Sequence, residues 1–334
     1  MKTLKFILII LCFWASVNSY TQNGWSISQT NLVFQGLHKN GNMLNISCEG
    51  GAILRTTNNG NSWKYIRESD LTGDYLYGSY FFNESTGIAC GFSPSILRTS
   101  NGGNTWDNVY STGRVIWALD FIDDMTGYAV GGSQYPYNIF LKTTNQGINW
   151  ISLVPPTNIT FKDINFLNST TGFIVGDSGL VMKTSNAGIN WELKYLSVVK
   201  TMKTVFFIDN NTGWIAGDSG KVFKTTNTGL NWSIQYTYTK YNVNDLYFSD
   251  INDGYCAMDS GRVLVTGDGG LNWQVSTIDP KYTLNSIIKT NNDIFAFGGF
   301  SLGTSEIVRE HSAYKSTNNG ASWENIISGN NYRK

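Results

Sequence analysis

Residues 160–191 read TFKDINFLNSTTGFIVGDSGLVMKTSNAGINW, and the pattern of this stretch decides the fold. Runs rich in branched and aromatic residues occupy 163–167, 173–175 and 180–183, and a fourth run begins at Trp191. Gly, Asn, Asp and Ser separate these runs, which is typical of short strands joined by tight turns. No helical periodicity competes with this pattern over a long window. The stretch therefore predicts a unit of four short strands.

The same unit recurs along the chain, most visibly as an eight-residue segment, S/T-x-N/D-x-G-x-x-W, which we call the repeat turn. Its tryptophans are separated by 43, 44, 41, 41, 41 and 50 residues. Four strands in roughly 40–45 residues are the signature of one propeller blade. The repeats predict an all-β fold, a seven-bladed β-propeller of four-stranded blades. The turns end at Trp63, Trp106, Trp150, Trp191, Trp232, Trp273 and Trp323.

Each repeated position of the turn has a structural task. The glycine supplies a backbone conformation that is costly for other residues. The Asn or Asp two places earlier can hydrogen-bond the amides of its own turn. The tryptophan offers a large surface to bury between neighbouring sheets. We therefore expect these turns to be structural, with the polar position held by Asn58, Asn101, Asn145, Asn186, Asn227, Asp268 and Asn318.

The composition of the 334-residue chain excludes several classes of function. Lys+Arg and Asp+Glu each number 24, so the chain lacks the basic surplus that a general nucleic-acid binder needs. The two histidines, His38 and His311, are too few for most zinc sites. Cys48, Cys90 and Cys256 show neither a metal-binding spacing nor a disulfide framework. The sequence predicts no metal, no cofactor and no nucleic-acid partner.

The N-terminal segment has the features of an export signal. A short basic start precedes the apolar run 6–14, and Val17-Asn18-Ser19 places small or medium residues at a cleavage site. We expect a signal peptide over 1–19 and a single propeller domain over 20–334. No later apolar stretch approaches the length of a membrane span, so we expect none in the mature chain. The predicted location is the periplasm, the cell surface or the medium.

The repeat turns resemble the Asp-box, or BNR repeat, of sialidase-type propellers. Only the turn ending at Trp273 has the family's acid, and the other six carry Asn. The layout G-x-x-x-G…K/R-T-x-N-x-G-x-x-W over residues 25–327 most resembles the photosystem II stability/assembly factor group. This resemblance implies an exported, non-catalytic propeller that binds another macromolecule, with a protein or an envelope complex as its partner. We expect a monomer.

The alternative hypothesis is a carbohydrate-binding protein or a divergent glycoside hydrolase. Sialidases use an F/Y-R-I-P segment, and none of the seven arginines here is followed by Ile-Pro. Residues 176–179 read GDSG, like a protease nucleophile motif, but the motif recurs at 217–220 and so predicts a hairpin. We predict no catalytic residue. Two carboxylates about 5–10 Å apart in the channel mouth would favour a hydrolase.

The candidate binding residues lie on one face of the predicted ring. Loops between second and third strands share a face with the links between blades, opposite the repeat turns, and we call this side the loop face. Longer loops at 132–138 and 299–313 fall there, as do the starts of the innermost strands. A concave polar mouth is the default binding site. The predicted binding residues are Trp117, Tyr135, Tyr137, Lys162, Asp163, Lys203 and Asp245.

A basic residue precedes the turn in six of the seven units. Such a rim can steer an acidic partner. The favoured interpretation is that the side-chain stems cover strand surface while the charged heads stay in water. The positions are Arg55, Arg98, Lys142, Lys183, Lys224 and Lys315, and Val265 is the exception.

Two segments compete for the outer strand of the last blade. Residues 24–27 resemble the strand start at 231–234, and residues 323–326 suit the same place. An outer strand from the N-terminus would remove an exposed edge. We expect one of the two segments to be an extra or capping strand.

Overall fold

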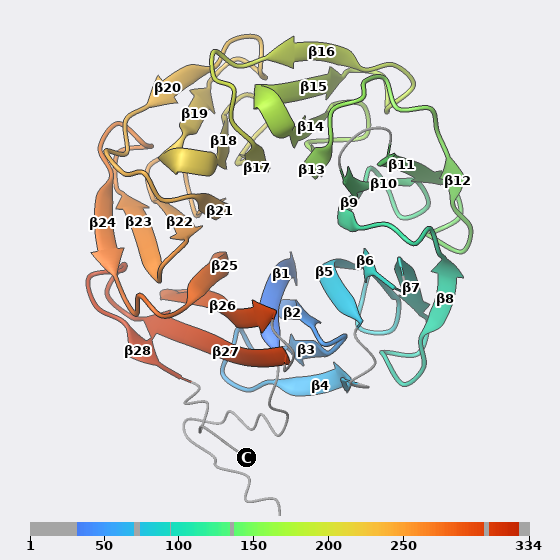
Figure 1. Cartoon of the computed structure of the whole chain (residues 1–334), viewed down its shortest axis with the longest axis horizontal. Helices are drawn as coiled ribbons and strands as arrows, with labels where there is room; N and C mark the ends of the chain where they lie inside the picture. Colours follow the sequence, from blue (N-terminus) through green and yellow to red (C-terminus); the bar gives the residue numbers. More distant parts are fainter. Residues whose placement is uncertain (1–31, 70–73, 94, 134–136, 304–306, 327–334) are drawn as a thin grey trace, which may run out of the picture.

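The computed structural model describes residues 32–326, apart from 70–73, 94, 134–136 and 304–306. In this part of the chain, seven groups of four strands surround a central channel (Figure 1). Five groups are separate four-stranded sheets, and the first two groups join in one eight-stranded sheet because Glu49 pairs with Tyr75. The predicted all-β propeller fold is confirmed.

The strands of each blade follow chain order from the channel to the rim. The first three blades contain β1 (Val33–Asn40), β2 (Met43–Glu49), β3 (Ile53–Thr56), β4 (Lys64–Arg67); β5 (Tyr75–Phe81), β6 (Gly87–Phe92), β7 (Ile96–Thr99), β8 (Asp107–Tyr110); and β9 (Ile116–Phe121), β10 (Gly127–Ser133), β11 (Tyr137–Thr143), β12 (Ile151–Ser152). The next two contain β13 (Phe161–Phe166), β14 (Gly172–Gly176), β15 (Leu180–Thr184), β16 (Glu192–Tyr195); and β17 (Met202–Phe207), β18 (Gly213–Gly217), β19 (Val222–Thr225), β20 (Ser233–Gln235). The last two contain β21 (Val243–Phe248), β22 (Gly254–Met258), β23 (Arg262–Thr266), β24 (Gln274–Thr277); and β25 (Thr283–Thr290), β26 (Asp293–Gly303), β27 (Ile307–Ser316), β28 (Glu324–Asn325).

Single 3-10 turns join the second and third strands of the fourth and fifth blades. They are η1 (Asp177–Gly179) and η2 (Asp218–Gly220). The protease-like GDSG segments therefore form tight hairpin connections, with Ser178 at a φ of 58° and exposed. Among the described residues, no helix is long and apolar enough to span a membrane.

The hydrophobic core lies between adjacent blades. The second strands β14, β18 and β22 are buried along their whole length because each sheet is covered on both faces by its neighbours. The contact between the third and fourth blades is typical, since Tyr128 meets Trp191 edge-on at 6.3 Å between ring centroids. Edge-to-face aromatic pairs add to the energy of area burial. The repeat tryptophan thus packs where two sheets meet.

The repeat turn is held by two side chains. In the fourth blade the Thr184 hydroxyl accepts the Gly188 N–H at 2.9 Å and donates to Asn186 Oδ1 at 3.0 Å. The same Oδ1 accepts the Asn190 N–H at 2.9 Å. Equivalent bonds occur in the other six turns. The role predicted for Asn or Asp alone is therefore shared with the hydroxyl residue two places before it.

The glycine of the repeat turn also allows the blades to approach. Gly188 has a φ of +77°, and a Cβ there would lie 2.5 Å from the ring of Tyr128 in the preceding blade. A side chain at this position would therefore meet both an unfavourable backbone region and a steric clash. The glycine therefore allows both the backbone conformation of the turn and the close packing of the two blades.

Four of the six basic residues before the turns, Arg55, Arg98, Lys183 and Lys224, bond to the next blade, whereas Lys142 and Lys315 contact their own blades. Lys183 donates from Nζ to the carbonyl of Thr228 at 2.6 Å, and its ammonium lies 5.7 Å from the ring centroid of Phe173. Lys224 bonds the Gly269 carbonyl at 2.9 Å in the same way. These contacts are with the turn of the next blade, so the charges hold adjacent blades together.

The last blade is completed by its own C-terminal segment. β28 pairs with β27 at the outer position, and residues 24–27 lie outside the described residues. The first and last blades meet through side chain-to-backbone bonds. Asn285 Nδ2 donates to Phe34 O at 2.8 Å, and Thr290 Oγ1 donates to Asn59 O at 3.2 Å.

The long connection predicted at 299–313 is mostly strand. β26 and β27 continue past the body of the blade and stay paired as far as Gly303 and Ile307. The reason lies in residues 299–303 and 307–313, which carry enough branched and aromatic residues to extend an antiparallel ladder. The prediction of a loop in this place was wrong.

The three cysteines of the described chain are free and buried. Burial raises the pKa of the Cys90 thiol to about 12. They behave as small apolar core residues.

Candidate functional site

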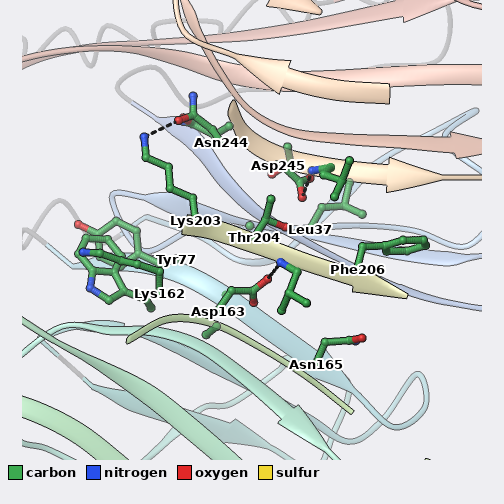
Figure 2. Close-up of a pocket in the computed structure, with 18 of the residues that line it drawn as sticks. Leu37, Tyr77, Lys162, Asp163, Asn165, Lys203, Thr204, Phe206, Asn244 and Asp245 are labelled. Atoms are coloured by element: carbon green, nitrogen blue, oxygen red, sulfur yellow. Dashed lines mark hydrogen bonds between the residues drawn. The ribbon is translucent and has the colours of Figure 1, made fainter. Parts of the chain in front are cut away.

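The channel holds a cavity of about 870 Å³ lined by the inner strands of all seven blades. Figure 2 shows its wall, with Tyr77, Lys162 and Lys203 gathered toward one end and Asn165 and Phe206 toward the other. The first group lies at the starts of inner strands. These starts follow the links between blades, so this end is the mouth on the loop face.

A β-bulge repeated in the inner strands builds the mouth. In β13, Phe161 pairs with Gly176 and Asp163 pairs with Val175, which leaves Lys162 as the extra residue. An extra residue bends the strand and redirects a side chain. Six inner strands have this bulge, and its extra residues are Tyr77, Trp117, Lys162, Lys203, Asn244 and Asn285. All six line the cavity.

In five of the six bulged blades a glycine at the end of the second strand faces the bulge, whereas Met258 holds this position in the sixth. A Cβ on Gly176 would lie 2.2 Å from the carbonyl oxygen of Thr160, so glycine allows the close approach of the two backbones in the fourth blade. Gly176 is the second glycine of the G-x-x-x-G layout quoted from the sequence. That glycine was the available signal for the bulge, and it would have identified Tyr77 and Asn285, which sequence analysis missed.

Aromatic rings and a lysine form one side of the mouth. The Tyr77 and Trp117 ring centroids are 4.7 Å apart, and the Trp117 indole donates to the Gly132 carbonyl at 3.0 Å. The Lys162 ammonium lies 4.8 Å from the Trp117 ring centroid. Burial lowers the pKa of Lys162, nearby Lys203 lowers it further, and Asp177 opposes both effects. Within the described residues this ammonium makes no hydrogen bond or ion pair, so its donors remain available.

A polar network forms the other side. Lys203 Nζ lies 3.3 Å from Asp218 Oδ1 and donates to Asn244 Oδ1 at 2.9 Å (Figure 2). Asn244 Nδ2 in turn donates to Asp259 at 2.8 Å. Thr201 donates to Asp177 at 2.8 Å. Acids and lysines thus alternate on this side of the mouth, and Lys203 and Asp218 are paired within the protein.

Asp163 and Asp245, two of the predicted binding residues, are engaged in hydrogen bonds between blades. Asp163 accepts the backbone N–H groups of Ile164 and Val205, at 2.8 and 2.9 Å, so it links its own blade to the next. Asp245 bonds the Leu246 and Ile287 N–H groups in the same way. Both side chains lie in the channel wall below the bulge rather than at the mouth.

Burial shifts the titration of these wall carboxylates. It raises the pKa of Asp163 to about 6 and that of Asp245 to about 7, although backbone donors act in the opposite direction. Asp120, whose carboxylate bonds the Phe166 N–H at 2.6 Å, has its pKa raised by burial to about 7. The wall therefore carries three carboxyl groups that favour protonation more than exposed acids do.

The predicted tyrosines cannot be placed in the site. Tyr135 lies outside the described residues, and Tyr137 begins β11 with its side chain outside them. Their role stays a prediction. Trp117, Lys162 and Lys203 do come together at the mouth.

The histidines are structural. His38 Nδ1 accepts the Phe81 N–H at 3.2 Å, and its ring packs 4.5 Å from that of Tyr80. Burial lowers the pKa of His38 to about 4, and the pKa of His311 to about 4 as well. Neutral imidazoles in these positions fill the walls between blades.

The groups at the mouth are suited to hydrogen bonding and to stacking against a bound ligand. Free ammonium donors, side-chain amides and aromatic faces surround the mouth, while Asp163, Asp245 and Asp259 already accept hydrogen bonds from the protein. The arrangement suits binding of a polar chain with apolar side groups.

Comparisons with known proteins agree with this fold. Residues 142–238 match the family model described as photosynthesis system II assembly factor YCF48. No curated protein sequence matches the chain significantly. The predicted resemblance to the assembly-factor propellers is confirmed.

Solved structures with the same fold include YCF48 from Cyanidioschyzon merolae, with a TM-score of 0.64 and 16% identity over 84% of this chain and 95% of that one. A structure of YCF48 bound to a D1 peptide gives a TM-score of 0.64 and 17% identity over 80% of this chain and 89% of that one. The propeller of U3-55K gives 0.67 and 10% identity over 84% and 94%. At these identities the likeness establishes the fold.

Proposed function

We propose that this BNR-repeat propeller, similar to the YCF48 assembly factors, is a non-catalytic protein that binds a polypeptide segment of a partner at the loop-face mouth of its channel. The similar YCF48 propeller has been solved with a D1 peptide bound. Propellers serve many functions, so the mouth itself has to carry the argument.

The observation that carries the proposal is the ring of bulge residues. The same local device in six blades presents one side chain each to a single opening. Those side chains include Trp117 and the unpaired ammonium of Lys162. A pocket with apolar surfaces and a few convergent polar groups is the usual form of a binding site. The side chain at this position differs between blades, being Tyr, Trp, Lys or Asn.

Export remains part of the proposal. The basic start, apolar run and cleavage-like residues of segment 1–19 support delivery to the periplasm, the cell surface or the medium. A partner in an envelope complex would fit such a location. Detection of the mature chain in the envelope or medium of the producing cell checks this step.

Capture from an envelope extract tests the proposed function. The purified chain is immobilised beside a Trp117→Ala/Lys162→Ala variant, and retained proteins are identified with and without competing glycans. We expect a protein partner that the wild type retains in the presence of glycans and the mouth variant loses.

The matched control is Ile189→Ala/Leu230→Ala, since these side chains are exposed in repeat turns on the opposite face. It should retain the partner fully. If the Trp117→Ala/Lys162→Ala variant retains the partner as well as the wild type does, the partner does not bind at the mouth. Release by glycans would instead support the carbohydrate-binding alternative.

A further inference from the structure

Three loops on the loop face of the fourth and fifth blades are tied together by hydrogen bonds. The Asp218 N–H donates to the Thr201 carbonyl at 2.9 Å, which joins the η2 turn to the preceding link. The Thr237 hydroxyl donates to the Gly220 carbonyl at 2.7 Å, which joins the same turn to the following link. Residues 198–201, 218–221 and 235–241 therefore form one continuous surface.

Two tyrosines project from this surface. Tyr238 is 95% exposed and Tyr236 is 63% exposed, and their ring planes are 29° apart with centroids separated by 6.2 Å. Between them, Thr237 is buried and hydrogen-bonded. The contact between their rings places Tyr236 and Tyr238 on the same side of the link.

The backbone holds Tyr238 in an unusual conformation. Its φ is +53°, a region that a bulky residue rarely adopts. A conformation of this kind persists when its surroundings impose it. The Thr237 anchor is the contact beside it that holds the link. Rigid tyrosines give large contact area at low cost in conformational entropy, which suits them to protein recognition.

Three lysines lie in the same three loops as the tyrosines. Lys200 and Lys240 are exposed in the two links, and Lys221 follows η2. Within the described residues none of these three ammonium groups makes a hydrogen bond or ion pair. Lys203, by contrast, is paired with Asp218. The three loops thus present an excess of unpaired positive charge beside two exposed aromatic rings.

We propose that Tyr236, Tyr238, Lys200, Lys221 and Lys240 form a second contact surface, the tyrosine–lysine patch, that binds an acidic segment bearing apolar side chains in the polypeptide partner. This inference rests on the proposed function and names the chemistry of the partner. Charge complementarity selects an acidic sequence and accelerates encounter. The patch directly precedes Asn242 and Asn244, so a segment bound there can continue into the channel mouth.

Peptide binding tests the patch. The probe is a fluorescent peptide that combines glutamates with leucines, and its counterpart has lysine at every glutamate position. Anisotropy of the full chain should show binding of the acidic probe that weakens with added salt, and much weaker binding of the basic one. We expect the Tyr236→Ala/Tyr238→Ala variant to bind the acidic probe about tenfold more weakly than the wild type. We expect the same of the Lys200→Glu/Lys240→Glu variant.

Matched controls lie on the opposite face and the first blade. Leu230→Ala/Leu271→Ala and Lys64→Glu alter exposed side chains away from the patch and should leave affinity unchanged. Unaltered thermal unfolding of each variant shows that the fold is intact. Equal binding of both probes, no saturable binding at millimolar peptide, or unchanged affinity in the tyrosine variant would overturn the patch.

A Trp117→Ala variant separates the two proposals. If this variant loses binding of the acidic probe and the tyrosine variant does not, the patch proposal is overturned and the mouth proposal stands. Loss in the tyrosine variant alone would support the patch and argue against the mouth. Envelope capture decides the proposed function independently of the probe.

Discussion

Single residues in the repeat turn do more than shape a loop. The Thr184 hydroxyl and Asn186 carbonyl oxygen satisfy the backbone amides of their own turn. Gly188 then brings that turn against Tyr128 of the preceding blade. One short motif thus fixes local geometry and blade contact together, which explains why it recurs in all seven units.

Gly188→Ala should destabilise the protein more than an alanine placed at another glycine with positive φ. Gly113 has a φ of +67° with open space around its Cβ position, whereas Gly188 faces Tyr128. We expect a loss of about 1 kcal/mol for Gly113→Ala from the backbone alone. For Gly188→Ala we expect about 2–4 kcal/mol, because overpacking is added. Urea unfolding measures both, and equal losses would contradict the packing argument.

The raised pKa of Asp163 makes the free energy of unfolding depend on pH. Burial raises its pKa from a usual value of 3.8 to about 6 in the folded chain. Between these values the native state holds more protons than the unfolded chain, so this group's contribution to stability falls as pH rises, and it levels off above about 6.

The stability of Asp163→Asn relative to wild type should therefore rise between pH 4 and 7. The substituted side chain has one oxygen instead of two, so one backbone N–H loses its acceptor. The resulting loss of stability does not vary with pH. Urea unfolding of both chains across this range gives the comparison. A difference in unfolding free energy that does not vary with pH would contradict the assigned shift.

Among the strands, the spacing of the repeats predicted more of the structure than any single motif did. Spacing of the turns and short apolar runs was enough to predict four strands per unit. The bulge at Lys162 was not predicted, because register depends on how closely Gly176 and Thr160 approach across two strands. The extended hairpin of β26 and β27 was missed because loop length was inferred from departure from the repeat.

Links between blades can be tested through the lysines before the turns. Lys183→Met removes a hydrogen bond to the Thr228 carbonyl and a contact with the Phe173 ring while keeping the apolar stem. We expect a loss of about 1–2 kcal/mol. Lys142→Met removes only the contact of its ammonium with the Tyr128 ring at 5.2 Å and should cost less. Thermal and urea unfolding compare the two, and equal losses would argue against the hydrogen bond.

For the whole molecule, the two faces of the ring differ in which residues they carry. The repeat turns keep a constant pattern on one face because they hold the blades together. The loop face carries the side chains that differ between blades, among them Trp117, Lys162 and Tyr238. Sequence analysis identified this face and three of the mouth residues. It could not separate mouth from wall, since Lys162 and Asp163 are adjacent and only the bulge sends them in different directions.

The central claim is that a polypeptide partner binds the loop face. Hydrogen–deuterium exchange of the chain, with and without the captured partner, tests it most directly. Slower exchange confined to the inner-strand starts around Lys162 and Lys203 and to the 235–241 link is the predicted result. Protection confined to the repeat turns would contradict the account.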